Sequence, residues 1–175
     1  MRKVILSLAI SLDNFIEGPN GEYDWCIIDP DYDFNSFFKS IDTIFVGRKT
    51  YEMSLKIGGH PPGFPKFKEY IFSTTLDKVK MGAILIKTDI KTEVEKIKNE
   101  KGKDIWLFGG ASLTTSLLNL GLIDELSLAV HPVILGSGKP LFQNINDRID
   151  LKLIDTKTYS KTGLVSLIYS IGQGK

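Results

Sequence analysis

Two glycine-containing joins between strand-like and helix-like segments are the positions in this chain best suited to bind an anion. In the first join, a buried strand-like run at 104–108 leads into Gly109 and Gly110, and a helix-like run begins at Ala111 and Ser112. A helix that starts there presents free backbone N–H groups and the positive end of its dipole. Because glycine carries no side chain, a phosphate group could approach this backbone closely. A plain strand-to-helix turn explains this join equally well when it is taken alone.

The second join places cations at the start of a helix. The strand-like run 42–46 is followed by Gly47, Arg48, Lys49 and Thr50. A helix dipole disfavours positive charge at its N-terminus, and an anionic ligand would reverse that penalty. An arginine fork also matches the geometry of a phosphate. Two solvated surface cations are the alternative, but two such joins in one small chain favour a dinucleotide site.

Composition limits the classes of function. The 175 residues, with 42% hydrophobic content, predict one domain over 1–172 and a frayed tail at 173–175. A net charge of +1 without long runs of like charge predicts no nucleic-acid partner. Cys26 is the only cysteine, which excludes an internal disulfide and argues against a metal site. No segment has the apolar length of a signal peptide or membrane span, so we expect a cytoplasmic protein without membrane contact.

Strand-like and helix-like segments alternate along the chain, which predicts an α/β fold. The expected strands lie at 3–12, 42–46, 70–73, 83–86, 104–108 and 123–131, and the expected helices at 32–40, from 47 onwards, 92–101 and 112–121. The segments 14–25 and 58–65 contain Gly and Pro clusters and are predicted loops. The last two strands, 151–159 and 164–171, predict an antiparallel hairpin on a mostly parallel sheet.

The expected helix at 32–40 carries Phe34, Phe37 and Phe38 at helical spacing, which we interpret as core contacts. Asp31 or Asp33 could cap its N-terminus, and Asp31 is the preferred cap. The charged helix at 92–101 is interpreted as a solvated face.

Several motifs, taken in order, resemble the dihydrofolate reductase-like fold, in particular its branch formed by the riboflavin-biosynthesis reductase (RibD C-terminal) domain and its small stand-alone relatives. The motifs are Ser11-Leu12-Asp13-Asn14-Phe15-Ile16, Gly47-Arg48-Lys49-Thr50-Tyr51-Glu52, Leu107-Phe108-Gly109-Gly110-Ala111, Gly121-Leu122-Ile123-Asp124-Glu125-Leu126 and His131-Pro132-Val133-Ile134-Leu135-Gly136-Ser137-Gly138. Each motif alone is unspecific, whereas their order and spacing over nearly the whole chain are specific to the fold. The resemblance implies a single-domain, mixed and mostly parallel sheet flanked by helices, and a reductase that uses NADPH.

The resemblance also assigns cofactor contacts. It implies that Arg48 meets the 2′-phosphate of NADPH, that Lys49 and Thr50 lie near the pyrophosphate, and that Ser73 and Thr74 make a second adenosine-phosphate contact. The full set of matching positions is Ala9, Ile16, Gly18, Gly47, Arg48, Lys49, Thr50, Ser73, Thr74, Phe108, Gly109, Gly110, Ala111 and Ser112. The first three would surround the nicotinamide, although core packing is an alternative for two of them, Ala9 and Ile16.

The substrate side is less defined by the motifs. Asp29, Asp31 and Asp33 lie near the position where dihydrofolate reductases place a catalytic carboxylate, and Asp33 is the preferred candidate. Trp25 could stack on a flat heterocycle or cover the core. No arginine-rich element indicates binding of a ribose phosphate. We expect a pterin-like, pyrimidine or other small heterocyclic or carbonyl substrate and slow turnover of dihydrofolate. A nucleotide-binding protein without turnover, or a subunit with a role in assembly, is the alternative.

A homodimer is the expected assembly. The apolar segment 129–142 would supply its interface, as the resemblance also implies, unless its side chains fold back on the core. Its apolar residues include Val133, Ile134, Leu135, Leu141 and Phe142. Neither His60 nor His131 has a partner at metal-ligand or triad spacing, so both are interpreted as structural or solvent-exposed.

Overall fold

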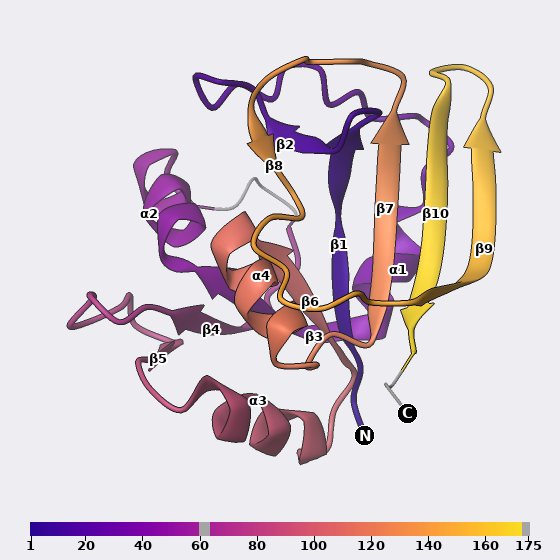
Figure 1. Ribbon diagram of the computed structural model, residues 1–175. Helices are drawn as coiled ribbons and strands as arrows, with labels where there is room; N and C mark the ends of the chain where they lie inside the picture. Colours follow the sequence, from indigo (N-terminus) through magenta and orange to yellow (C-terminus); the bar gives the residue numbers. More distant parts are fainter. Residues whose placement is uncertain (60–63, 173–175) are drawn as a thin grey trace.

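An eight-stranded sheet forms the centre of the protein in the computed structural model, which describes residues 1–59 and 64–172 (Figure 1). Its strands are β1 Val4–Ser11, β3 Ile41–Gly47, β4 Lys68–Phe72, β5 Ala83–Ile86, β6 Asp104–Gly109, β7 Glu125–His131, β9 Leu151–Tyr159 and β10 Leu164–Ile171. The order across the sheet is β5-β4-β3-β6-β1-β7-β10-β9. All neighbours from β5 to β7 are parallel, whereas β10 runs antiparallel to both β7 and β9. The predicted mixed sheet and its C-terminal hairpin are therefore confirmed.

Four helices connect and cover the described strands: α1 Phe34–Ser40, α2 Arg48–Lys56, α3 Ile90–Asn99 and α4 Ala111–Asn119. In Figure 1, α4 lies in front of the sheet and α1 lies behind it. A small second sheet pairs β2 Phe15–Glu17 with β8 Lys139–Pro140. The sequence analysis predicted only a loop at 14–25, because three residues are too few to show the alternation of a strand.

The main core lies between the central strands and α4. Val4 and Leu6 of β1, Leu107 of β6 and Leu117 of α4 have no exposed surface and belong to one cluster. These strands read as continuous apolar runs because a parallel sheet covered by helices buries both of its faces. The core thereby fixes the carboxyl ends of β3, β6 and β1 next to one another.

Helix α1 corrects two expectations. Its N-cap is Asp33, whose side chain accepts the Ser36 N–H at 3.0 Å, and not Asp31. None of the residues of α1 is buried, so Phe34, Phe37 and Phe38 are not core contacts. They line a cavity instead.

Helix α3 is not a purely solvated face. Val94 and Ile97 are buried in the main core. Lys98 is also buried, and its ammonium lies 2.8 Å from the Asp124 carboxylate. Val94 and Ile97 form an apolar stripe at helical spacing, but the many charged residues around them make the segment look fully solvated in the sequence.

Some expectations concern residues outside the described ranges, namely His60 and the tail at 173–175. No helix within the described ranges is long and apolar enough to cross a lipid bilayer. The part of the chain that the structure describes contains no group of three or more His, Cys, Asp or Glu side chains placed to hold a metal ion.

Candidate active site

A polar cleft of about 410 Å³ lies where the carboxyl ends of β3, β4 and β6 meet the N-termini of α2 and α4. Its described lining residues are Gly47, Arg48, Lys49, Thr50, Phe72, Ser73, Thr74, Thr75, Ile86, Lys87, Ile90, Gly110, Ala111, Ser112, Leu113, Ser116, Lys139 and Gln143. Ligands of open α/β sheets bind at this edge because strand ends and helix starts converge there. The N-cap residues of both helices, Gly47 and Gly110, provide no side-chain hydrogen bond. The first N–H groups of both helices are therefore available to an anion.

The two glycine joins identified in the sequence meet in this cleft. A Cβ atom on Gly47 would lie 3.3 Å from the Gly110 nitrogen, and a Cβ atom on Gly110 would lie 3.1 Å from Thr50 Oγ1. The peptide between Gly109 and Gly110 is cis, and Gly109 has a φ of 133°. Both contacts are tighter than an ordinary van der Waals approach, so a side chain at either position would push the two joins apart by a few tenths of an ångström.

Three of the cleft cations have carboxylate partners. Arg48 Nη1 lies 3.0 and 2.9 Å from the two carboxylate oxygens of Glu52, one helical turn away. Lys87 pairs with Asp77 at 3.2 Å, and Lys139 of β8 pairs with Glu17 of β2 at 2.8 Å. The Arg48 and Glu52 side chains are each 39% exposed, so their attraction is screened by water. A phosphate group can replace Glu52 as the partner of Arg48.

The structure gathers most of the predicted cofactor residues in the cleft, but not all of them. Gly47, Arg48, Lys49, Thr50, Ser73, Thr74, Gly110, Ala111 and Ser112 line it. Phe108 packs edge-on against Trp106 at 4.8 Å, and Ala9 lines a second cavity. Ile16 packs against the main core, and Gly18 closes a turn by donating its N–H to the Glu22 carbonyl at 2.8 Å.

Sequence reasoning missed several cleft residues. Thr75 continues the Ser73-Thr74 pair, and Lys87 follows the strand 83–86 at the same sheet edge. The rule that parallel strand ends align could have found both of these residues. Gln143 reaches the cleft from a distant loop, and no local pattern marks it.

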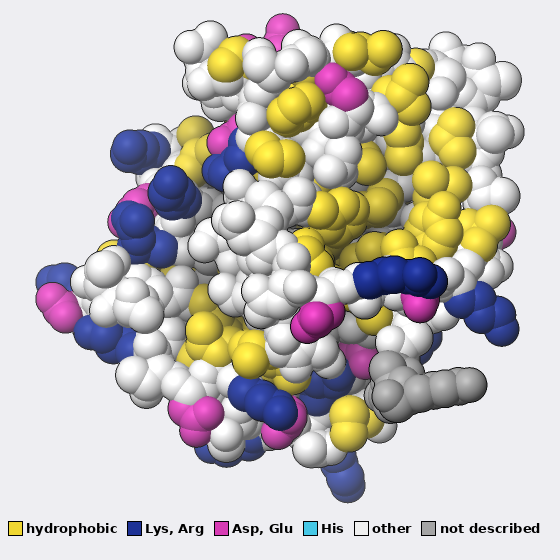
Figure 2. Space-filling model, viewed as in Figure 1, with side chains coloured by type: hydrophobic (Ala, Val, Ile, Leu, Met, Phe, Trp, Pro, Cys, Tyr) yellow, Lys and Arg dark blue, Asp and Glu magenta, His cyan; other side chains and the backbone are white. Residues whose placement is uncertain are grey.

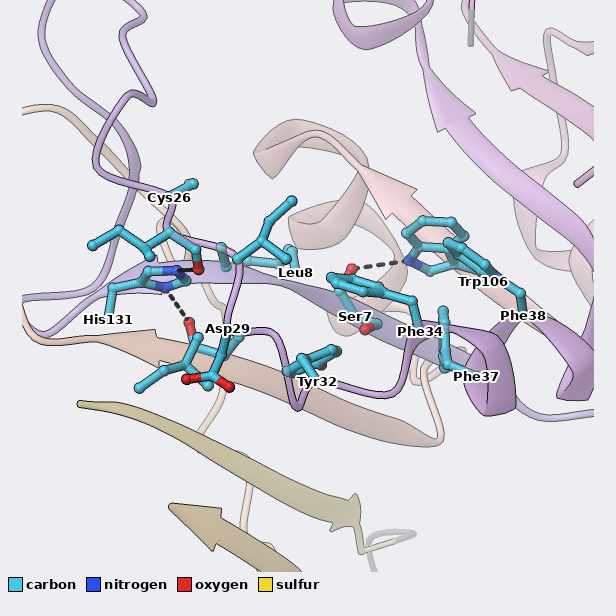
Figure 3. A pocket seen from close by; sticks show the side chains of 15 residues that line it. Ser7, Leu8, Cys26, Asp29, Tyr32, Phe34, Phe37, Phe38, Trp106 and His131 are labelled. Atoms are coloured by element: carbon cyan, nitrogen blue, oxygen red, sulfur yellow. Dashed lines mark hydrogen bonds between the residues drawn. The ribbon is translucent and has the colours of Figure 1, made fainter. Parts of the chain in front are cut away.

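A second, apolar cavity of about 210 Å³ is formed by β1, the loop that precedes α1, α1 itself and parts of β6, β7 and β10 (Figure 3). Its described lining residues are Ser7, Leu8, Ala9, Cys26, Ile27, Ile28, Asp29, Tyr32, Phe34, Phe37, Phe38, Trp106, Ala129, His131 and Leu164. An apolar cavity with a few converging polar groups is typical of a site for a small organic ligand.

Aromatic rings make one side of this cavity. Phe37 meets Trp106 edge-on with 5.3 Å between ring centroids, and Phe34 lies 4.5 Å from Tyr32. The Trp106 indole N–H donates to the Ser7 carbonyl at 2.9 Å. The only polar atom of the Trp106 side chain is therefore hydrogen-bonded within the protein, so the rest of the indole presents an apolar surface.

His131 is one of the polar groups in the cavity wall and is only 3% exposed. Its Nδ1 lies 3.0 Å from the Ala129 carbonyl, and its Nε2 lies 3.1 Å from the Ile27 carbonyl. Trp25 packs edge-on against the imidazole at 5.5 Å. His131 therefore attaches the loop before α1 to β7 and is not solvent-exposed. No sequence pattern around His131 indicates this position in a cavity wall.

Asp29 is the charged residue of the cavity wall, and it is 2% exposed. It accepts the Asp31 N–H at 2.9 Å and the Thr162 hydroxyl at 2.7 Å. Burial raises the pKa of this carboxyl, but the two hydrogen bonds and the charges of Lys161 and Lys157 outweigh burial and hold the pKa below its usual value. Asp29 is thus an ionised group that joins the loop before α1 to the final hairpin.

The two predicted catalytic residues lie outside the described cavity wall. Asp33 is exposed, and its hydrogen bonds from the Ser36 hydroxyl and N–H lower the pKa of its carboxyl. Trp25 packs against His131, and its indole nitrogen is buried without a hydrogen-bond partner in the described structure. Cys26 does line the cavity, and burial, assisted by the charge of Asp24, raises the pKa of its thiol to about 11.

Comparison with known proteins places these features in a family. The sequence model of the RibD C-terminal domain matches residues 2–165. The uncharacterized protein YyaP of Bacillus subtilis (strain 168) is 47% identical over 178 residues, which cover 96% of this chain and 94% of that protein.

Solved structures have the same fold. A putative riboflavin biosynthesis protein from Shewanella sp. PV-4 superposes with a TM-score of 0.82 at 24% identity, covering 99% of this chain and 100% of the other. The Enterococcus faecalis dihydrofolate reductase complexed with NADP(H) superposes with a TM-score of 0.67 at 17% identity, covering 98% of this chain and 97% of the other. The chain belongs to the RibD C-terminal domain family and has the dihydrofolate reductase-like fold.

Proposed function

We propose that this member of the RibD C-terminal domain family is an NADPH-dependent reductase that acts on a small heterocyclic (pterin-like or pyrimidine) or carbonyl substrate. The observation that carries the proposal is the meeting of two glycine joins, with uncapped helix N-termini, beside Arg48, Lys49 and Thr50. The complex of the E. faecalis dihydrofolate reductase with NADP(H) supports this choice of cofactor.

Each part of the cleft suits one part of NADPH. The N–H groups at the start of α4, with the Thr50 hydroxyl, would hold the pyrophosphate. Arg48, Ser73 and Thr74 would hold the adenosine 2′-phosphate through charge-assisted hydrogen bonds. Ala9 of β1 lines the apolar cavity. A nicotinamide beside Ala9 would therefore face a substrate held in that cavity.

Bound NADPH would supply the hydride, and the protein must hold the acceptor and admit a proton. Asp29 is ionised and accepts a hydrogen bond from the Thr162 hydroxyl, so it is a poor proton donor. Asp33 remains a predicted catalytic residue, although its contacts support the role of a helix cap. We propose that the proton comes from water, and the expected slow turnover of dihydrofolate stays a prediction.

The test is a titration with NADPH and NADH, monitored by nicotinamide fluorescence. Arg48→Ala should weaken NADPH binding by about ten- to a hundredfold, because a charge-assisted contact contributes about 1.5–3 kcal/mol. NADH binding should hardly change. Arg148→Ala is the matched control, because Arg148 is also paired with a carboxylate but does not line the cleft. Equal affinity of the unmutated protein for the two cofactors would refute the role of Arg48.

A protein that binds NADPH without efficient turnover is the second candidate. The one carboxylate among the described cavity residues, Asp29, is ionised and hydrogen-bonded to Thr162, which favours this candidate. Oxidation of NADPH in the presence of a panel of pterins, pyrimidines and carbonyl compounds distinguishes the candidates. The cytoplasmic location also stays a prediction.

A homodimer remains part of the proposal, with its interface revised. Leu141 is fully buried and Phe142 packs against the core, whereas Ile134 is 71% exposed. A larger apolar surface lies over β10 and the edge strand β9, as Figure 2 shows. Leu151 and Leu153 of β9 are 43% and 50% exposed. Exposed apolar edge strands readily pair with another chain. Sedimentation should show a dimer that Leu153→Lys dissociates, and a monomeric unmutated protein at micromolar concentration would contradict this.

A further inference from the structure

We infer that the apolar cavity selects a flat, uncharged aromatic ring that carries no phosphate group. The inference rests on the proposed function, because it names the substrate class of the proposed reductase. It distinguishes this chain from reductases of the same fold whose substrate carries a ribose phosphate, such as the Thermotoga maritima 5-amino-6-(5-phosphoribosylamino)uracil reductase.

The charges of the cavity wall oppose a phosphate. No lysine or arginine occurs among the described lining residues, and the charged residue among them is Asp29. Its carboxylate is ionised and already accepts two hydrogen bonds. A phosphate placed here would lose its hydration without a cationic partner and would be repelled by Asp29.

The nearest cations of the neighbouring hairpin face other groups. Lys161 lies 2.9 Å from the carboxylate of Asp31. Lys157 lies 4.7 Å from the ring centroid of Tyr159 and 3.5 Å from the Asp31 carbonyl. Neither lysine lines the cavity. Their positions neutralise the acidic loop before α1 and do not create an anion site.

The rings of the wall favour a flat, apolar ligand. Phe34 lines the cavity and is 40% exposed, so a ligand can reach its ring from solvent. Tyr32 and Phe38 lie 4.5 and 6.0 Å from it between ring centroids, and Trp106 lies deeper beside Phe37. Planar rings pack well in such an arrangement, by offset stacking or edge-on contact. Figure 3 shows Phe34, Phe37, Phe38 and Trp106 on one side of the cavity, His131 on the other and Tyr32 between them.

The test compares two probes that differ by one phosphate, 2-naphthol and 2-naphthyl phosphate. Binding is measured by calorimetry with the full chain, and protection of the Cys26 thiol from iodoacetamide reports whether the probe occupies the cavity. We expect 2-naphthol to protect Cys26 and to bind at least about tenfold more tightly than its phosphate ester. Protection by the ester at an equal or lower concentration, or no protection by 2-naphthol, would overturn the inference.

Variants of Phe34 test the wall itself. Phe34→Ala should weaken 2-naphthol binding several-fold, roughly the loss of one aromatic contact. Ile84→Ala is the matched control, because Ile84 is also 40% exposed but lies on the edge strand β5. Phe34→Arg should remove the preference for 2-naphthol over its phosphate ester, because the arginine gives the phosphate a cationic partner. An unchanged preference in this variant would contradict the charge argument.

The same samples keep the two proposals separate. A protein that prefers 2-naphthol but does not bind NADPH would refute the reductase and leave the cavity inference standing. A protein that binds NADPH but prefers the phosphate ester would refute the cavity inference and leave the reductase standing.

Discussion

The polar cleft and the apolar cavity present opposite kinds of groups to a ligand. The polar cleft presents backbone N–H groups, hydroxyls and cations from the starts of α2 and α4. The apolar cavity presents aromatic rings and an ionised Asp29, with no cation in its described wall. These charges would favour a phosphate in the first and oppose one in the second. The comparison teaches that backbone geometry shapes one site of this fold, whereas side chains set the chemistry of the other.

The largest effect should come from Gly110→Val, which would break the polar cleft. The new side chain would meet Thr50 Oγ1, which lies 3.1 Å from the Cβ position, and would cover the N–H groups at the start of α4. We expect NADPH affinity to fall by about a hundredfold or more. Gly172→Val is the control, because its Cβ would meet nothing closer than 3.6 Å. A folded Gly110→Val protein, shown by circular dichroism, that binds NADPH normally would place the phosphate elsewhere.

A second prediction measures the low polarity of the cavity. The pKa of Cys26 is about 11, so at pH 8 its reactive thiolate is rare compared with that of a free cysteine. Iodoacetamide should modify Cys26 about a hundredfold more slowly in the native protein than in urea. The native rate should rise about tenfold per pH unit up to the region of the pKa. Equal rates in the two conditions at pH 8 would show that the thiol is not desolvated.

A third prediction sharpens the description of the cleft and concerns a smaller effect. Glu52 pairs with Arg48 and would compete with the 2′-phosphate of the proposed cofactor for it. Glu52→Gln should therefore raise NADPH affinity by about two- to fivefold and leave NADH affinity unchanged, as expected for an exposed pair. Glu100→Gln is the control, because Glu100 is a similarly exposed carboxylate paired with Lys68. An equal gain for NADH would show that the effect is not specific to the 2′-phosphate.

The smallest effect concerns the loops that follow β1 and β7. The Ser11 hydroxyl, followed by the Gly136 and Leu135 N–H groups, lowers the pKa of Asp13. A lowered folded-state pKa gives stability that is present above the unfolded-state pKa and is lost as pH falls through the folded-state pKa. Asp13→Asn should lower the melting temperature at pH 7, and the difference should close as pH falls below about 4. A constant difference from pH 7 to pH 3 would contradict this linkage.

The polar cleft could be predicted from the sequence because each half of it is local. In both joins a strand, a glycine and a helix start follow one another within ten residues or so, and a parallel sheet must bring such joins to one edge. Arg48 and Gly110 were therefore found without knowledge of the contacts between them. The spacing of Asp31 and Asp33 fits either residue as the cap of α1. The sequence therefore could not exclude Asp33, which is the cap in the structure.

The apolar cavity could not be predicted in the same way. Its wall combines Ala9, Phe37, Trp106, His131 and Leu164, which are far apart in the chain. Each of them reads locally as an ordinary core or surface residue. His131 lacked a side-chain partner in the sequence because its partners are backbone carbonyls, which no residue pattern reveals.

The hydrogen bond from Thr162 to Asp29 joins residues far apart in the chain, so the apolar cavity can be completed only late in synthesis. Gln143 is the last described residue of the polar cleft, whereas the apolar cavity also needs Leu164 and the turn that carries Thr162. During synthesis from the N-terminus, the whole lining of the cleft is translated before that of the cavity. Closing the loop from residue 29 to residue 162 lowers the conformational entropy of the chain, and this can happen only after the turn that carries Thr162 has been made. A nascent chain would therefore contain every lining residue of the polar cleft before the apolar cavity could form.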